Sequence, residues 1–463
     1  MTGVPSSQPP RDDAPPRGSV GRRVAAALAT IALGQGLTAV AQLAGVTLLL
    51  VAWGARLYGE WLILFAIPAY LSVSDLGFAS VAGNEMTMLA ARGERERACE
   101  LFRAVSNLLL VGSVALIVVG LPLLWFLPVR RMFGLRELSE GETTTLLILL
   151  ICQVVVTIQS GVLDAGFRAG GRFPLGALCR QSVRVAEVSA VPLAATLGAP
   201  PVGAAAALLA VTIAGNGLSW LVLRRTVTWL RFRLGRPQWK VVRPIARPAL
   251  AYSALPLGNA LSLQGMVLVV GAAAGPLAVV VFHTARTLSR LPQGLMYAIN
   301  QSVWPEVTNA VAAGNLRLAR TIHRRACQGS LLLTALVVAL LLPLGTTIID
   351  LWTGGKVDVS FTLFGLLLLV IGLNSLWFTS SVVLVATNSH QAMALLYLGG
   401  SVLALSLAAV FVPLAGLVGA AWSLAAIDGI MVGFVLPRSL RLVRDSPAAF
   451  LSSIFRIPRM ALR

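Results

Sequence analysis

Long stretches without any charged residue interrupt this chain of 463 residues. No Asp, Glu, Lys or Arg lies between Arg23 and Arg56, or anywhere between Asp358 and Asp428. A membrane-spanning helix needs ~20 consecutive apolar residues, because it must cross ~30 Å of hydrocarbon. The strands of a membrane barrel would be only ~10 residues long and would alternate in polarity, which these stretches do not. The stretches therefore predict membrane-spanning helices.

The composition excludes most soluble functions. Apolar residues make up 57% of the chain and charged residues 12%, about half the usual share for a soluble domain. No GxxxxGK[ST], HExxH or GxSxG motif is present. The longest predicted outer loop (129–143) has room for no catalytic domain. The four cysteines form no CxxC pair, and the three histidines lie far apart. We therefore expect no enzymatic activity, no cofactor and no bound metal.

Turn-forming residues divide the apolar stretches into separate helices. Gly275-Pro276 is one such signal, and Gly198-Ala199-Pro200-Pro201 is another. The pattern predicts twelve helices, at 24–53, 59–82, 104–128, 144–166, 173–196, 202–223, 249–273, 277–304, 327–349, 360–386, 391–411 and 416–436.

The basic residues are distributed very unevenly between the two sides of this predicted topology. Of 37 Lys and Arg, 28 lie in the segments on the same side as the N-terminus and five on the other side. The positive-inside rule then places both termini in the cytoplasm. The net charge of +19 is explained by this topology and by attraction to anionic membrane lipids. It predicts no nucleic-acid partner.

The two halves of the chain resemble each other weakly. Sliding the second half over the first until Gly275 falls on Gly54 also aligns Gly314 with Gly93, without gaps. A duplicated six-helix unit is predicted, and two-half transporters place their substrate site between the halves. The predicted domains are a disordered tail (1–23), an N-terminal bundle (24–223), a cytoplasmic linker (224–248), a C-terminal bundle (249–436) and a basic tail (437–463). Part of the basic tail is amphipathic and is expected to lie on the inner leaflet as an interfacial helix.

The predicted eighth helix carries a stripe of polar residues, although polar groups inside a membrane cost free energy and need a reason. At the spacing of an α-helix, six of them fall on one face of that helix. They are His283, Arg286, Arg290, Gln293, Tyr297 and Gln301. The stripe either forms hydrogen bonds between helices or lines a cavity. Arginine does not lose its charge in proteins, so a cavity wall here favours an anionic ligand.

Further charged residues lie in the first half and in the last helix. Arg180, Arg184 and Glu187 share one face of the fifth helix, where Glu187 either pairs with Arg184 or faces a cavity. Glu187, Asp75 and Asp428 are candidates for coupling to an ion such as H⁺ or Na⁺. For Asp75 and Asp428 a structural hydrogen bond is an equal alternative.

Several short motifs resemble the Wzx-type polysaccharide flippases of the multidrug/oligosaccharidyl-lipid/polysaccharide (MOP) exporter superfamily. The resemblance covers roughly residues 24–436. The motifs are Gly54-Ala-Arg-Leu-Tyr-Gly-Glu60, Ser74-Asp75-Leu76-Gly77-Phe78, Ala91-Arg92-Gly93, Phe167-Arg-Ala-Gly-Gly-Arg172, Ser253-Ala-Leu-Pro256, Trp304-Pro305-Glu306 and Ala313-Gly314-Asn315.

The resemblance implies a MATE-like, V-shaped pair of six-helix bundles in the bacterial inner membrane. It implies transport of an undecaprenyl-diphosphate-linked oligosaccharide for surface polysaccharide, with polymerase and export machinery as partners. Arg286, Arg290, Arg180 and Arg184 would then hold the diphosphate. An ion-coupled multidrug antiporter of the same superfamily is the alternative, although such exporters tend to carry acidic cavities.

Overall fold

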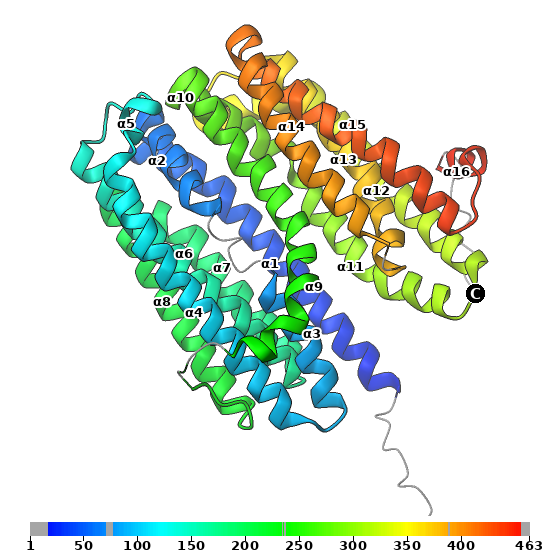
Figure 1. Cartoon of the computed structure of the whole chain (residues 1–463). Coiled ribbons are helices and arrows are strands. Elements are labelled where there is room, and N and C mark those ends of the chain that lie inside the picture. Colours follow the sequence, from blue (N-terminus) through cyan, green and yellow to red (C-terminus); the bar gives the residue numbers. More distant parts are fainter. Residues whose placement is uncertain (1–16, 71–76, 234, 236–237, 388, 455–463) are drawn as a thin grey trace, which may run out of the picture.

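Helices make up most of the part of the chain that the structure describes, and no strand is present in that part (Figure 1). This computed structural model describes residues 17–70, 77–233, 235, 238–387 and 389–454. Within these ranges, nine helical segments are long and apolar enough to cross a membrane. The predicted all-α polytopic membrane fold is confirmed. Most of the predicted N-terminal tail and the end of the predicted basic tail lie outside the described ranges.

The helices of the first half are α1 (Arg17–Ala52), α2 (Gly54–Ala69), α3 (Phe78–Ala91), α4 (Arg95–Phe126), α5 (Val129–Met132), α6 (Glu140–Ala169), α7 (Phe173–Thr196) and α8 (Pro201–Thr226). The second half contains α9 (Trp239–Ala260), the π-helical turn η2 (Leu261–Gly265), α10 (Met266–Ser289), α11 (Leu291–Ala312), α12 (Leu316–Thr353), α13 (Phe361–Ala386), α14 (Gln391–Ala415), α15 (Leu417–Leu442) and α16 (Pro447–Ile454).

Two predicted helices are divided in the structure. The helix predicted at 59–82 is replaced by α2 and α3, which pack along the same helix, α6. The helix predicted at 277–304 is interrupted at Arg290, whose backbone (φ −87°, ψ 2°) separates α10 from α11. Pro292 explains the interruption, because it has no N–H to donate to the preceding turn.

The chain reverses at Gly275, inside α10, as the turn signal predicted. Gly275 has φ +83°, a left-handed conformation that glycine adopts without strain. Residues on either side of it lie opposite each other: a Cβ on Gly271 would lie 3.4 Å from Val279, and Arg286 binds the carbonyl of Ser262. The 51-residue apolar segment Trp239–Ser289 therefore contains two antiparallel passages.

The repeat suggested by the alignment of the two halves is present in the backbone. Gly54, Gly93, Gly275 and Gly314 all have positive φ, between 68° and 83°. The alignment that pairs these glycines also places the start of α12 on the start of α4, and the end of α11 on the end of α3. The weak sequence signal thus identifies equivalent turns in the two halves.

Most helices pack mainly on helices of their own half, except α2, which packs mainly on α10. In the first half, α6 packs against α2, α3, α4 and α8, while α7 packs between α1 and α8. In the second half, α13 packs against α11, α12 and α15, and α14 packs against α9 and α15. Figure 1 shows the two groups of helices meeting near α2 and α10. We call the end of the molecule that carries the Gly93 turn, the segment 227–233, the Gly314 turn and α16 the basic end.

The bundles are joined by hydrogen bonds at the end opposite the basic end. The Trp352 indole N–H donates to the carbonyl of Leu43 (3.0 Å), and the hydroxyl of Thr47 donates to the carbonyl of Trp352 (3.0 Å). Lys356 Nζ donates to the carbonyl of Leu50 (3.1 Å) near the C-terminus of α1, where a cation is favourable. These contacts between α1 and the end of α12 hold the halves together there.

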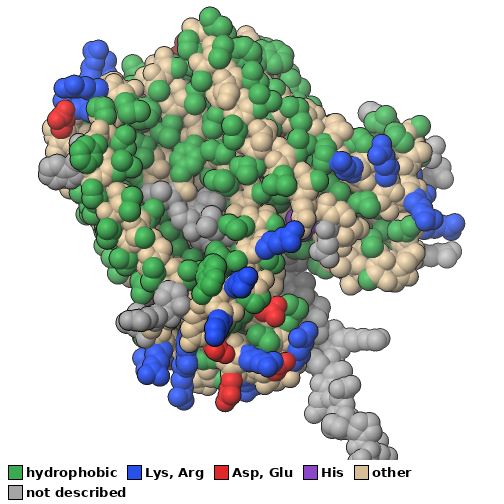
Figure 2. Space-filling view, viewed as in Figure 1, with side chains coloured by type: hydrophobic (Ala, Val, Ile, Leu, Met, Phe, Trp, Pro, Cys, Tyr) green, Lys and Arg blue, Asp and Glu red, His purple; other side chains and the backbone are tan. Residues whose placement is uncertain are grey.

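The surface pattern agrees with a membrane protein. Figure 2 shows hydrophobic side chains over most of the upper part of the face, with Lys and Arg along its lower part and at its left and right edges. Many large apolar side chains are exposed, among them Leu336, Val119 and Phe126. In water such exposure would be unfavourable, whereas in a bilayer it faces hydrocarbon.

A buried carboxylate fastens the outer loop of the first half. Glu60 on α2 is fully buried and accepts the backbone N–H groups of Arg136 (2.5 Å), Glu137 (2.9 Å) and Leu138 (3.1 Å). The same loop leads into α6, whose start is stabilised by a capping box between Ser139 and Glu142. The carboxylate therefore positions α6 relative to α2.

Replacing Glu60 with glutamine should destabilise the protein by roughly 1–3 kcal/mol, because the amide nitrogen would place a donor against backbone donors that now have an acceptor. Thermal unfolding of the purified protein measures this, with Glu140→Gln, an exposed residue at the start of α6, as the matched control. Equal melting temperatures for E60Q and the control would show that the contact contributes nothing.

Candidate functional site

The π-helical turn η2 positions the first arginine of the predicted stripe. A π-helical turn shifts the backbone hydrogen-bond pattern and leaves carbonyl groups free for other donors. Arg286 uses this opportunity: its guanidinium donates two hydrogen bonds to the carbonyl of Ser262 (3.1 Å each) and a longer one to Leu263 (3.5 Å). The reversal at Gly275 places these groups opposite each other.

Arg290 begins a chain of hydrogen bonds that crosses the second bundle. Its Nε donates to Gln293 Oε1 (2.6 Å), and Gln293 Nε2 donates to Asn374 Oδ1 (3.3 Å). Asn374 Nδ2 in turn donates to Asp428 Oδ1 (3.0 Å). The chain thus joins α10, α11, α13 and α15, and it explains why a carboxylate is tolerated inside the last long helix.

Asp428 is well buried, with 6% of its surface exposed. The Trp377 indole N–H donates a second hydrogen bond to the same oxygen (2.6 Å). A buried carboxylate needs such partners, because an unpaired charge in an apolar interior is very costly. The sequence left open whether Asp428 carries a coupling ion or makes a structural hydrogen bond, and the structure shows the hydrogen bonds.

These residues line a small cavity of about 40 Å³. Arg286, Arg290, Gln293, Asn374 and Asp428 all contribute to it. The volume suits one or a few water molecules. Its other polar lining residues are Asn259, Ser262, Ser289 and Tyr397.

The cavity belongs to the second bundle alone. All its lining residues lie between Asn259 and Asp428, whereas the sequence predicted that the arginines lie between the two halves. The sequence left open whether the stripe forms hydrogen bonds between helices or lines a cavity. Arg286 does both here, because it binds η2 of the same bundle and also lines this cavity. Two cations and one carboxylate line the cavity, so its described side chains carry an excess of positive charge.

The predicted stripe is only partly assembled. Arg286, Arg290 and Gln293 share the cavity, but His283 and Tyr297 do not line it. The His283 ring instead meets Tyr58 of α2 edge-on, at 6.4 Å between ring centroids. Tyr297 is 40% exposed and its hydroxyl accepts a hydrogen bond from Gln301 (2.5 Å) within α11. The predicted stripe assumed one continuous helix. Because the helix is interrupted at Arg290, residues before and after it no longer share one helix face.

The charged residues of the first half form a separate group. Arg180 NH1 pairs with Asp164 Oδ2 at 2.6 Å, and 49% of the Arg180 side chain is exposed. Arg184 is also accessible from the surface. An exposed arginine on a membrane helix requires contact with water or lipid headgroups. These two arginines lie in the first half of the chain, apart from Arg286 and Arg290.

The sequence left open whether Glu187 pairs with Arg184 or faces a cavity, and in the structure it contacts α8. Its carboxylate accepts a hydrogen bond from the hydroxyl of Thr212 on α8 (2.9 Å). Among the ion pairs of the described residues, none joins Glu187 to Arg184. Asp75, the third coupling candidate, lies outside the described residues. Within the described part of the chain, no group of three or more His, Cys, Asp or Glu could hold a metal ion.

Asn374, Trp377 and Tyr397 are among the residues of the site that were not predicted. Asn374 and Trp377 are three positions apart on α13, and Tyr397 lies on α14. The spacing of Asn374 and Trp377 places both on one face of α13, a helix without charged residues, and this pattern could have indicated the site. The convergence of these two side chains on Asp428 depends on tertiary packing.

Comparisons with known proteins identify the fold of the chain but no related sequence. No protein-family model and no curated protein matches the chain. A multidrug resistance MATE family transporter of the MOP superfamily, solved in an inward-facing conformation, matches with a TM-score of 0.68 and 16% identity, over 90% of this chain and 96% of that one.

Two further solved structures agree. An outward-facing MATE family transporter of the MOP superfamily has a TM-score of 0.67 and 15% identity, over 94% of this chain and 97% of that one. A MOP superfamily transporter from Pyrococcus furiosus, described by the reverse polarity of its binding pocket, has a TM-score of 0.64 and 15% identity, over 91% and 96% of the two chains. The chain therefore has the fold of the MATE family transporters of the MOP superfamily.

Proposed function

We propose that this protein transports a lipid-linked oligosaccharide, with a prenyl diphosphate as the linkage, across the bacterial inner membrane by alternating access. The fold supports a transporter, because solved proteins of this fold are described in both inward-facing and outward-facing conformations. The motifs that resemble Wzx-type flippases support the cargo. The hydrogen bonds between α1 and α12 hold the predicted outer end closed.

The observation that carries the proposal is the excess positive charge in the second bundle. Arg286 and Arg290 line the cavity with a single carboxylate, Asp428. A diphosphate offers several anionic oxygens, and guanidinium groups bind such oxygens through strong charge-assisted hydrogen bonds. A glycan linked through a diphosphate therefore suits this cavity better than a cationic drug does.

Cargo binding requires the second bundle to open. A cavity of about 40 Å³ holds water but has no room for a diphosphate. Arg286 also donates its hydrogen bonds to backbone carbonyls in η2. In the proposed cycle the helices around the cavity separate, the arginines exchange these weaker partners for phosphate oxygens, and Arg180 and Arg184 provide a second cationic surface.

A second function, that of an ion-coupled multidrug antiporter, is favoured by one observation. Asp428 is a carboxylate in the cavity and is able to take a proton or attract a cation. Asp428, Glu187 and Asp75 remain the proposed coupling groups under either function. The two functions differ in the sign of the cargo charge.

Reconstitution of the purified protein distinguishes the two functions. Proteoliposomes receive a fluorescent prenyl-diphosphate sugar in one experiment and a cationic dye in another. The proposal predicts that the protein moves the diphosphate lipid between leaflets and leaves the dye where it is. Movement of the dye alone would establish the antiporter. If neither the diphosphate lipid nor the dye moves across the membrane, both proposed functions are refuted. Loss of surface glycan in a deletion strain gives the corresponding cellular result.

A further inference from the structure

The segment that follows the last long helix of the first half is fastened to α4. Arg103 Nε donates to the carbonyl of Arg231 (2.8 Å). Asn107, one turn further along α4, donates to the carbonyl of Arg233 (3.1 Å) and accepts the N–H of Gly235 (3.2 Å). The linker between the halves therefore does not simply cross from one bundle to the next. Its first part, residues 227–233, is held along one face of α4.

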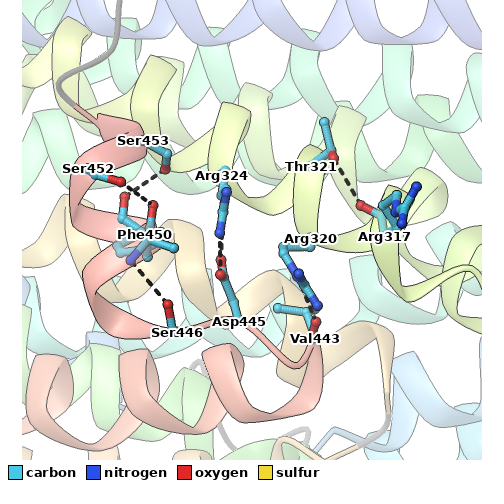
Figure 3. A network of polar contacts seen from close by, with 11 residues as sticks. Arg317, Arg320, Thr321, Arg324, Val443, Asp445, Ser446, Phe450, Ser452 and Ser453 are labelled. Atoms are coloured by element: carbon cyan, nitrogen blue, oxygen red, sulfur yellow. Dashed lines mark hydrogen bonds and ion pairs between the residues drawn. The ribbon is translucent and has the colours of Figure 1, made fainter.

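The segment that follows α15 is fastened to α12 in the second half. Arg324 forms a two-pronged ion pair with Asp445, with Nε donating to Oδ2 at 2.7 Å and NH2 donating to Oδ1. Arg320 Nε donates to the carbonyl of Val443 (3.3 Å). Figure 3 shows both arginines pointing from α12 toward this segment. The Asp445 side chain is only 1% exposed, so this is a sheltered contact.

The same contact continues into α16. Phe450 is 1% exposed and stacks on the ring of His323, at 5.5 Å between centroids. Gln328 Nε2 donates to the carbonyl of Ile454 (3.2 Å). The sequence predicted that the C-terminal segment lies on the inner leaflet. The structure shows that Phe450 on one face of α16 packs against α12. Leu451, on another face of α16, is 54% exposed.

The two attachments occupy equivalent positions. The alignment that pairs the Gly93 and Gly314 turns also places Arg103 on Arg324 and Asn107 on Gln328. In each half these side chains lie four positions apart, on one helix face. In each half they hold the segment that leaves the last long helix, after Thr226 in α8 and after Leu442 in α15.

Each attachment links two helices that otherwise pack mainly on a third helix between them. This third helix is α6 in the first half and α13 in the second. Helix α4 packs mainly on α3 and α6, and α8 packs mainly on α6 and α7. Similarly, α12 packs mainly on α11 and α13, and α15 on α13 and α14. The held segments therefore close a ring of helices at the basic end of each bundle.

We propose that these attachments are a duplicated clasp that makes the basic end of each bundle a rigid unit. The α4 clasp consists of Arg103 and Asn107 with the first part of the linker, and the α12 clasp consists of Arg320, Arg324 and Gln328 with residues 443–454. A transporter that alternates access moves one bundle against the other, and that motion reaches the cargo only if each bundle keeps its shape. The role of the clasps in transport rests on the proposed function. The existence of the clasps does not depend on it.

Two native thiols report on the clasps separately. Cys99 lies under the linker, with Sγ 3.6 Å from the carbonyl of Arg231, and is 7% exposed. Cys327 lies under α16 in a cluster with Leu440 and Phe450, and is 1% exposed. Replacing Cys152 and Cys179 with serine leaves these two as the reactive thiols, and a water-soluble maleimide measures their labelling rates in the otherwise intact protein.

Opening one clasp should expose one thiol. Asp445→Ala is expected to raise the labelling rate of Cys327 about tenfold or more and to leave Cys99 unchanged, because the charge-assisted contact that seats α16 is lost. The double variant R103A/N107A is expected to do the reverse. The exchanged pair R324D/D445R should restore slow labelling of Cys327, which also provides a folded comparison if D445A is unstable.

The outcomes separate the clasp from the transport proposal. Unchanged labelling of Cys327 in D445A, or equal acceleration of both thiols in both variants, would overturn the clasps. The labelling uses no cargo, so it gives the same answer whether or not the protein moves a diphosphate lipid. If it does move one, either opened clasp should lower the transport rate severalfold and leave cargo affinity unchanged.

Discussion

Replacing both Arg286 and Arg290 with alanine is expected to reduce transport of a prenyl-diphosphate sugar by two orders of magnitude or more. Each arginine would contribute charge-assisted hydrogen bonds to the diphosphate, and the loss of ~1.5–3 kcal/mol per arginine corresponds to roughly 10- to 100-fold each. The initial rate of lipid movement in proteoliposomes measures this. Protein folding should survive, because Asp428 keeps its hydrogen bonds from Asn374 and Trp377.

Two matched variants make this result specific. The lysine pair R286K/R290K keeps the charges but loses the planar geometry that binds two phosphate oxygens at once, so an intermediate rate is expected. Arg92→Ala removes an exposed arginine at the end of α3 and should leave the rate unchanged. A wild-type rate in R286A/R290A would show that the cavity does not hold the cargo.

Replacement of Asp428 is expected to have two different effects, depending on the new residue. Alanine leaves the Trp377 indole and the Asn374 amide without the acceptor that they share. Each buried donor left without an acceptor costs roughly 1–3 kcal/mol, so Asp428→Ala should lower the melting temperature strongly. Asparagine keeps the shape and an acceptor for Trp377, so Asp428→Asn should remain folded.

The asparagine variant then tests ion coupling. If Asp428 exchanges an ion during the cycle, transport by D428N should no longer respond to an imposed pH or Na⁺ gradient, because an amide does not titrate at these pH values. Proteoliposomes with and without the gradient give the comparison, with Glu187→Gln as the equivalent change in the first half. A gradient response equal to that of the wild type would assign Asp428 a structural role only.

The sequence predicted the fold well because membrane helices depend on simple, local properties. The absence of charge between Arg23 and Arg56 requires a helix in lipid whatever surrounds it. The reversal at Gly275 was readable for a similar reason, since Gly-Pro ends one helix and starts the next. Even the repeat was visible, because the Gly93 and Gly314 turns need the same positive φ.

The site was predicted only in part, since it depends on partners from other helices. The stripe assumed a continuous helix, although Pro292 already signalled the interruption beside Arg290. The pairing of Arg180 with Asp164 joins α6 to α7, and the contact of Asp428 with Asn374 joins α13 to α15. Such pairs follow from bundle packing, which periodicity along one helix does not reveal.

The central claim is that Arg286 and Arg290 bind an anionic cargo, and a binding measurement tests it most directly. Geranyl diphosphate and geraniol, which differ in the diphosphate, are titrated into the purified protein and into R286A/R290A. The account predicts that the wild type binds the diphosphate more tightly than the alcohol, and that the double variant loses this preference. Equal binding of the diphosphate by the two proteins would contradict it.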